Sequence, residues 1–195
     1  MPHDAALPTF RLLPGTTLTQ AQPWQHPPVT LDSPALAVMT DLTQFRAATT
    51  HPETSLREAE QTMIYQGVRM LFVVTDMPSL EGLITTTDLH GEKQMRLVHE
   101  RKVVYDELCV ADVMTGLAHL DAMDLAVMRN ARVGDVIATL KRFGRNHLLV
   151  VEAAGGGPRR VRGVISRSQI ERQLGSVIDL APIADSFSEI EQALV

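Results

Sequence analysis

The sequence predicts a mixed α/β fold of the α+β type, in which two β-α-β-β-α motifs pack around a pseudo-twofold axis. The first indication is an internal repeat, because apolar and glycine positions of one half recur 77 residues later in the other. The matched pairs are Leu56 and Val133, Met63 and Leu140, Gly67 and Gly144, and Val73 and Val150. The second indication is hydrophobic spacing, since each copy has an amphipathic helical stretch followed by a short apolar strand.

The first copy begins with a well-marked helix at residues 51–67, HPETSLREAEQTMIYQG. Ser55 and Glu58 have the spacing of a capping box, in which each side chain bonds the backbone N–H of the other residue. Gly67 follows the last apolar position and is expected to end the helix. The apolar run MLFVV at residues 70–74 then predicts a buried strand.

A polar segment, TTTD at residues 85–88, follows the next predicted strand, which begins at residues 83–84. We expect Asp88 to begin a helix that continues through GEKQM. Hydroxyls and a carboxylate at a helix start suit a sugar-phosphate ligand, because helix-start N–H groups favour anions and a carboxylate accepts ribose hydroxyls. The same residue types are also ordinary helix caps, so this segment leaves both interpretations open.

The second copy repeats this order. Residues 125–128 are the expected first strand, residues 133–144 the helix, and residues 147–151 the buried strand. Residues 161–166 are its expected pair, and residues 166–175, SRSQIERQLG, are the expected closing helix. The copies differ in length only within predicted loops, as diverging repeats do.

These motifs together resemble the tandem cystathionine-β-synthase (CBS) domain pair, of the bacterial stand-alone type. The first copy reads VMT, TTHPETSLREAEQTM, GVRMLFVVTD and GLITTTD, with Phe72 where the family has a proline. The second copy reads VMT, ARVGDVIATL, GRNHLLVVE and GVISRSQ. It departs from the family twice, because Leu149 replaces the proline and Gln169 replaces the aspartate.

The resemblance implies a regulatory, non-catalytic module that binds adenosine ligands such as AMP, ADP, ATP or S-adenosylmethionine in clefts between the copies. No further cofactor is implied. In the first cleft the aspartate would hold ribose and a threonine a phosphate, and the site residues carried over are Gly82, Thr85, Thr86 and Asp88. Phosphate contacts are implied for Arg69 and His147. The second, degenerate cleft would contain Gly163, Ser166, Arg167 and Gln169.

The cleft with Asp88 is expected to bind more tightly than the cleft with Gln169. A carboxylate makes charge-assisted bonds to ribose, whereas an amide makes neutral ones, and the difference should be about 1–2 kcal/mol. The alternative function is a structural or dimerisation module that binds no nucleotide. A homodimer is expected in either case, because apolar helix positions at residues 59–64 and 136–140 leave surface to bury. The protein target is not predicted.

An enzyme is not predicted, since the sequence has no HExxH, GxSxG or Walker motif. The net charge of −5 gives no reason to expect nucleic-acid binding. There is no apolar run long enough for a membrane span and no secretory signal, and the single cysteine suits a reducing compartment, so we expect a cytoplasmic protein. The basic run at residues 159–162 is expected to be a solvated loop or a phosphate-attracting patch.

Four segments are expected. Residues 1–34 hold most of the prolines and predict an irregular arm, whose Leu12, Leu13 and Trp24 are apolar enough to pack on something. Residues 35–107 are the first motif with a connecting helix, and residues 108–175 the second motif. Residues 176–195 are a tail with a short amphipathic helix.

Overall fold

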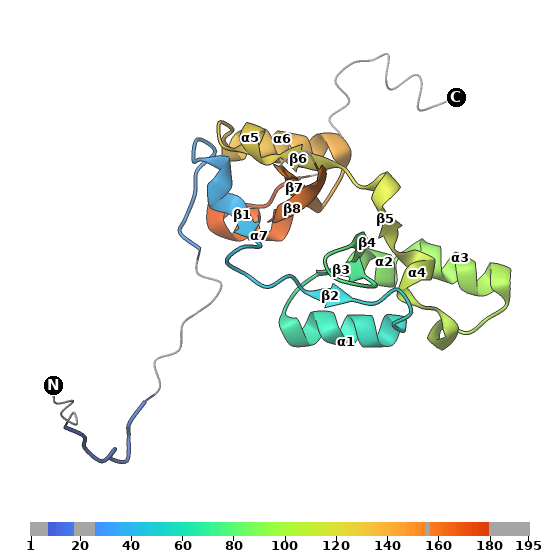
Figure 1. Ribbon diagram of the computed structural model, residues 1–195, viewed down its shortest axis with the longest axis horizontal. Coiled ribbons are helices and arrows are strands. Elements are labelled where there is room, and N and C mark those ends of the chain that lie inside the picture. Colours follow the sequence, from blue (N-terminus) through green and yellow to red (C-terminus); the bar gives the residue numbers. More distant parts are fainter. Residues whose placement is uncertain (1–7, 18–25, 155–156, 180–195) are drawn as a thin grey trace.

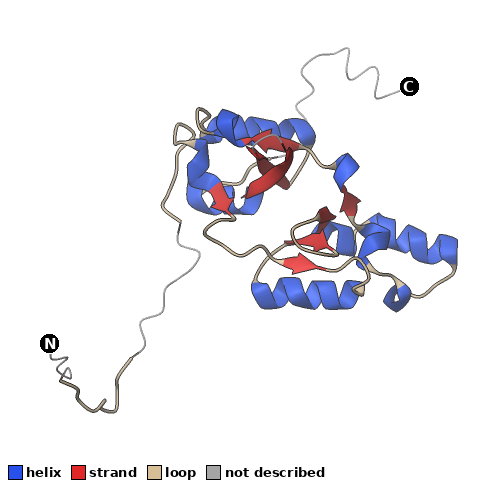
Figure 2. Cartoon of the chain, viewed as in Figure 1, coloured by secondary structure: helices blue, strands red, loops and turns tan. Residues whose placement is uncertain are grey.

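The computed structural model describes residues 8–17, 26–154 and 157–179, and within them the chain forms two four-stranded sheets, each with its own helices (Figures 1 and 2). One sheet has the order β2 (Thr49–Thr50), β3 (Met70–Val74), β4 (Leu80–Thr85), β5 (Thr115–Gly116). The other has the order β1 (Met39–Asp41), β8 (Gly157–Ser166), β7 (His147–Ala154), β6 (Ala122–Asp124).

The helices fall into the same two groups. Those of the first half and the connection are α1 (Leu56–Gln66), α2 (Thr86–His90), α3 (Glu92–Arg101) and α4 (Val110–Val113). Those of the second half are α5 (Leu125–Met128), α6 (Val133–Phe143) and α7 (Arg167–Leu174). Short 3-10 helices are η1 (Ala35–Val38), η2 (Tyr105–Glu107) and η3 (Leu117–His119).

Equivalent residues occupy equivalent strands, which confirms the predicted pair of motifs. Val73 of β3 pairs with Gly82, and Val150 of β7 pairs with Gly163. The strand that precedes each copy joins the sheet of the other copy, because β1 pairs antiparallel with β8 and β5 pairs antiparallel with β4. The two halves are therefore linked by an exchange of edge strands.

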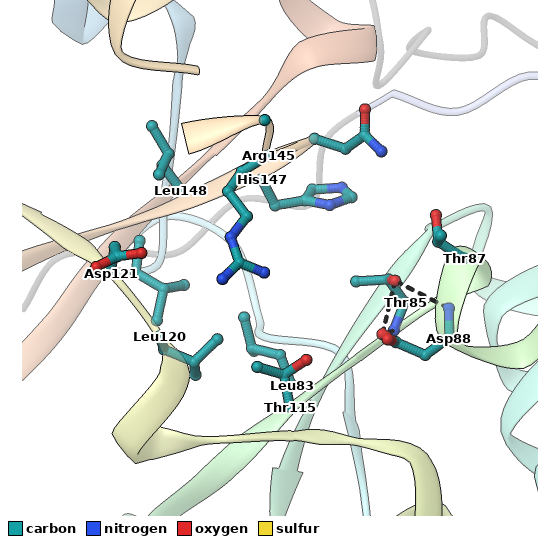
Figure 3. A pocket seen from close by; sticks show the side chains of 13 residues that line it. Leu83, Thr85, Thr87, Asp88, Thr115, Leu120, Asp121, Arg145, His147 and Leu148 are labelled. Carbon is teal, nitrogen blue, oxygen red and sulfur yellow. Dashed lines mark hydrogen bonds between the residues drawn. The ribbon is translucent and has the colours of Figure 1, made fainter. Parts of the chain in front are cut away.

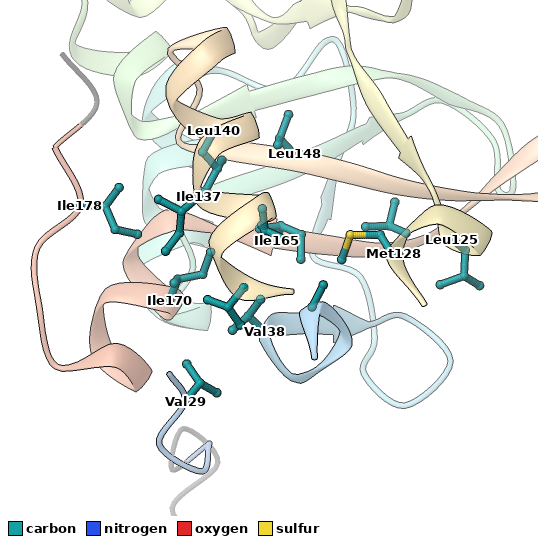
Figure 4. Close-up of a cluster of buried hydrophobic side chains, with 14 residues drawn as sticks. Val29, Val38, Leu125, Met128, Ile137, Leu140, Leu148, Ile165, Ile170 and Ile178 are labelled. Carbon is teal, nitrogen blue, oxygen red and sulfur yellow. The ribbon is translucent and has the colours of Figure 1, made fainter. Parts of the chain in front are cut away.

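Each half has its own hydrophobic core. In the first half the buried face of α1 packs with β3 and β4, and the cluster includes Leu56, Met63, Leu71 and Ile84. The second half has the larger cluster, drawn in Figure 4, in which α6 and α7 cover β7 and β8. Its residues include Val38, Leu140, Ile165 and Ile170.

A third cluster joins the two sheets. It is formed by Met70, Phe72 and Leu83 of one sheet with Leu149 and Val164 of the other. Phe72 and Leu149 are the two residues that stand in place of the family's proline. Their side chains therefore contribute apolar area to the contact between the halves, where burial is worth about 25 cal/mol per Å².

Helix α1 begins and ends as predicted. Ser55 and Glu58 form the capping box, and the backbone N–H of Glu58 donates to Ser55 Oγ over 3.2 Å. Gly67 ends the helix at φ 65°, in the left-handed region that favours glycine. The sequence reasoning about this helix is confirmed at both termini.

Two predicted elements were wrong. Residues 125–128 form helix α5, because Asp124 accepts a hydrogen bond from the Ala126 backbone N–H over 2.8 Å and starts a helix after the short strand β6. The helix expected to run on from Asp88 is divided at Gly91 into α2 and α3. Gly91 has extended backbone, at φ −82° and ψ −179°, which interrupts the helical hydrogen bonds.

Most of the apolar helix positions named in the dimer prediction are buried, whereas Ile64 of α1 is exposed. Ala59 and Met63 of α1 are buried in their own core, as are Val136 and Leu140 of α6. Leu12 and Leu13 of the arm are exposed, so they do not pack on the module. Trp24 and the predicted tail helix lie outside the described residues.

None of the helices in the described parts of the chain is both long and apolar enough to cross a membrane.

Candidate functional site

Two clefts lie where the copies meet, and they are related by the internal repeat. The Asp88 cleft, of about 170 Å³, lies between the start of α2 and the segment that leads into β7 (Figure 3). The Gln169 cleft, of about 690 Å³, lies between the start of α7 and the segment that leads into β3. Each cleft therefore takes its walls from both copies.

The Asp88 carboxylate serves as a helix cap. Its Oδ2 accepts a hydrogen bond from the Thr85 backbone N–H over 2.8 Å and one from Thr85 Oγ1 over 2.7 Å. Figure 3 shows this pair at the wall of the cleft. The capping interpretation of the TTTD segment is thus realised in the structure. A carboxylate has about four acceptor positions, so Oδ1 keeps capacity for a further donor.

Gln169 occupies the equivalent place in the second copy but points its amide into a polar network. It is buried, and its Oε1 accepts from Thr40 Oγ1 over 3.0 Å while its Nε2 donates to Gln173 Oε1 over 3.4 Å. Gln173 Nε2 donates in turn to the backbone oxygens of Pro27 and Ala37, each over 3.1 Å. The network thereby attaches residues near the N-terminal arm to α7.

The caps of the two helices differ in a second way. Ser166 stands where Thr85 stands, yet its side chain makes no capping bond to α7. Its hydroxyl instead lies 3.0 Å from that of Ser168. Both serines line the Gln169 cleft, so this cleft offers two hydroxyls with spare hydrogen-bonding capacity.

Three arginines line the Gln169 cleft, namely Arg46, Arg69 and Arg172. Among the residues that the structure describes, none forms an ion pair with any of these three guanidinium groups. The acid in the same wall, Glu171, is bonded to Arg167 over 2.8 Å and to the Ile178 backbone N–H over 2.9 Å. Burial acts to raise the pKa of Glu171, but these bonds outweigh it and hold the pKa below its usual value.

His147 lines both clefts and is the one predicted site residue that they share. Burial, with a smaller contribution from the positive charge of Arg69, lowers its pKa from 6.5 to about 4. The imidazole is therefore neutral near pH 7. It can accept a hydrogen bond from a ligand in either cleft.

The structure brings some predicted site residues to the clefts and leaves others away from them. Thr85 and Asp88 line the Asp88 cleft, and Arg69, Ser166 and Gln169 line the Gln169 cleft. The predicted residues that line neither cleft are Gly82, Thr86, Gly163 and Arg167.

Those four residues have structural surroundings. Gly82 passes so close to Thr115 that an added Cβ would strike the Thr115 carbonyl oxygen, and a Cβ on Gly163 would lie 2.6 Å from the Met39 side chain. Arg167 is directed to Glu171 and to Asn146. The backbone N–H of Thr86 donates to the Arg69 carbonyl across the β3–β4 pair, over 3.1 Å.

Sequence reasoning missed the cleft residues contributed by the exchanged strands and the loops after them. These are Thr115, Leu120 and Asp121 in the Asp88 cleft, and Thr40, Phe45 and Arg46 in the Gln169 cleft. Arg145 and Arg172 were missed as well. The repeated VMT motif was the available signal, because its two threonines, Thr40 and Thr115, take equivalent places in the two clefts.

The basic run at residues 159–162 belongs to strand β8 and is largely paired, so it is not a loop. Arg159 forms an ion pair with Asp124 over 2.9 Å, and Arg162 pairs with Asp41 over 2.6 Å and with Glu152 over 3.6 Å. Neither paired guanidinium is left to attract a phosphate.

Comparison with known proteins identifies the motifs. The family model described as CBS domain matches residues 37–92. A conserved protein from Pyrococcus horikoshii has a solved structure with a TM-score of 0.53 and 22% identity, over 74% of this chain and 93% of that one. CBSX2 from Arabidopsis thaliana, solved in complex with AMP, has a TM-score of 0.50 and 20% identity, over 72% and 94%.

A CBS domain pair solved in complex with 5-methylthioadenosine and S-adenosyl-L-methionine has a TM-score of 0.50 and 18% identity, over 72% of this chain and 98% of that one. No curated protein matches the sequence. At these identities the solved structures establish the fold. Residues 37–92 match the CBS domain, and the two copies together have the fold of a CBS pair.

Proposed function

We propose that the chain is a non-catalytic regulatory module that binds an adenosine ligand in the Gln169 cleft. The observation that carries this proposal is the combination of size and lining in that cleft. Its volume of about 690 Å³ lies in the usual range for small-molecule sites, roughly 300–1,000 Å³. Such sites have mostly apolar walls with a few convergent polar groups.

The lining divides into parts that suit the parts of a nucleotide. Leu42, Phe45, Phe72 and Val164 provide apolar area for a purine ring. The hydroxyls of Ser166 and Ser168 can bond ribose or phosphate oxygens, and the arginines can bond phosphate. The adenosine part of the proposal is supported by the CBS structures solved with AMP and with 5-methylthioadenosine and S-adenosyl-L-methionine.

This proposal reverses the order of affinities expected from the sequence. The Asp88 cleft is about 170 Å³, below the usual size for such a site, and the Arg145 side chain projects into it in Figure 3. One oxygen of Asp88 is already committed to its cap. Asp88 Oδ1 remains as the partner for ribose if a ligand enters there as well.

Calorimetry on a matched pair of variants tests which cleft is used. The ligands are AMP, ADP, ATP, S-adenosylmethionine and NAD. Ser166→Ala should weaken binding about five- to tenfold, the loss expected for one hydrogen bond, whereas Thr85→Val, at the equivalent place in the other cleft, should leave the affinity unchanged. Loss of binding with Thr85→Val alone would move the site to the Asp88 cleft. Absence of binding by all five ligands would reject the proposal.

The alternative, a structural module without a ligand, has one observation in its favour. The side chain at the end of each motif already bonds within the protein, Asp88 as a helix cap and Gln169 in its network. A module of this kind should show no thermal shift with any of the five ligands. A rise in melting temperature that grows with ligand concentration would exclude it.

We also propose that the chain forms a homodimer through α1. Ile64 and Tyr65 on this helix are 74% and 93% exposed, and apolar side chains that stand together on a surface are typical of an interface. Light scattering should give twice the monomer mass at micromolar concentration. A Tyr65→Glu variant should be a monomer, and a wild-type monomer would contradict the proposal.

A further inference from the structure

The two clefts carry different charges. Arg46 lines the Gln169 cleft and Asp121 lines the Asp88 cleft, and each lies in the loop after the VMT motif of its copy, six residues beyond the threonine. The charged residues of the Asp88 cleft are Asp88, Asp121 and Arg145. Those of the Gln169 cleft are Arg46, Arg69, Arg172 and Glu171, and the acid is already paired outside the set.

The three arginines come from three separate elements. Arg46 precedes β2, Arg69 precedes β3, and Arg172 lies on α7. A guanidinium stays charged at any pH at which the protein is folded, so three positive charges surround this cleft without an ion-pair partner among the described residues. Arg69 interacts with Glu171 only at longer range. Their mutual repulsion is relieved when an anion enters, and planar guanidinium groups match phosphate oxygens in bidentate pairs.

We propose that the Gln169 cleft is selective for polyphosphates, meaning ligands with two or more phosphate groups, and that Arg46, Arg69 and Arg172 determine this selectivity. A single phosphate offers too few oxygens to engage three bidentate guanidinium groups from three directions. A diphosphate or triphosphate chain spreads its charge along the cleft. The adenosine part of the ligand rests on the proposed function, but the phosphate part does not.

Calorimetry with adenosine, AMP, ADP and ATP, in buffer free of divalent metals, tests the proposal. The affinity should rise along that series, with ADP binding at least about tenfold tighter than AMP, because the second phosphate adds charge-assisted bonds to the guanidinium groups. A higher salt concentration should weaken the binding of ADP more than that of adenosine, because salt screens exposed charges. Inorganic tripolyphosphate, which has no adenosine, should compete with ADP.

Variants assign the effect to the arginines. Arg46→Ala, Arg69→Ala and Arg172→Ala should each weaken ADP binding about tenfold or more while changing adenosine binding little. Arg160→Ala is the matched control, since Arg160 is an exposed arginine on β8 that lines neither cleft. Arg46→Asp, which copies the charge of Asp121, should have the largest effect.

The outcomes separate this inference from the proposed function. Equal affinities for adenosine, AMP and ADP, or equal losses with Arg160→Ala and Arg46→Ala, would overturn the inference and leave an adenosine site. Binding of tripolyphosphate without any preference for adenosine nucleotides would uphold the inference and overturn the adenosine assignment.

Discussion

The two copies share one backbone plan and use the end of their common motif differently. Thr86 and Arg167 donate their backbone N–H groups to equivalent carbonyls, of Arg69 and Asn146, so the main chain is preserved. Among the described residues, the hydrogen bonds of Asp88 all lie within its own first turn, whereas Gln169 accepts one from Thr40 on the exchanged strand β1. The first copy uses this position for local capping, and the second uses it to hold distant segments together. A motif that matches its family well is therefore no guide to which cleft is free to bind.

The largest expected effect on stability concerns the two exchanged strands, each of which packs closely against one glycine of the other copy. Gly82 lies against β5 and Gly163 lies against β1. Gly82→Ala should cost about 3 kcal/mol of the free energy of unfolding, because the new Cβ strikes the Thr115 carbonyl oxygen and the backbone cannot move aside. Gly163→Ala should cost about 1 kcal/mol, since the Cβ meets mainly the flexible Met39 side chain. Urea unfolding of both variants measures the difference. Equal losses of unfolding free energy in the two variants would mean that both contacts with the exchanged strands tolerate an added Cβ equally well.

Sequence reasoning reached the elements whose signals are local. The capping box of Ser55 and Glu58, the stop at Gly67 and the repeat itself need only a few neighbouring residues to specify them. Residues 125–128 were misread because LAVM is a short apolar run, which suits a strand or a buried helix turn equally. The cap from Asp124 decides between them, and its orientation is fixed only in the folded chain.

The clefts were harder to predict because they depend on contacts between distant segments. Arg46 and Arg172 are far apart in sequence and line one cleft because the strands exchange between sheets. The network of Gln169 likewise requires β1 to lie beside β8, which the motif spacing does not specify. The family pattern identified the segment that ends each motif, but not what its side chains bond.

A second comparison concerns His147 and its equivalent in the first copy, Met70. The folded protein keeps His147 neutral down to about pH 4, whereas the unfolded chain takes up a proton below about pH 6.5. Stability should therefore fall as the pH drops through this window, by up to about 3 kcal/mol from this group. His147→Met, which copies Met70, should remove that part of the pH dependence.

Urea unfolding of the wild type and of His147→Met between pH 7 and pH 4 gives the pH dependence of the free energy of unfolding for each protein. The carboxylates contribute equally to both proteins, so the difference between the curves isolates the imidazole. Parallel curves would show that His147 has an ordinary pKa in the folded state. A wild type that gains stability toward pH 4, relative to the variant, would reverse the predicted sign.

The smallest expected effect compares the two motif ends themselves. Asp88→Ala removes a cap and should cost about 1 kcal/mol of the free energy of unfolding. Gln169→Ala should cost about 2 kcal/mol, because it leaves the Thr40 hydroxyl without its acceptor and Gln173 Oε1 without its donor in a buried place. Amide hydrogen exchange adds a positional readout, since Val29 donates its backbone N–H to Gln173 and should exchange faster only in Gln169→Ala. Two outcomes would contradict this contrast. One is a larger loss of unfolding free energy in Asp88→Ala than in Gln169→Ala, and the other is the same Val29 exchange rate in both variants. Either would mean that the network does not anchor the N-terminal segment and that the two copies differ in sequence alone.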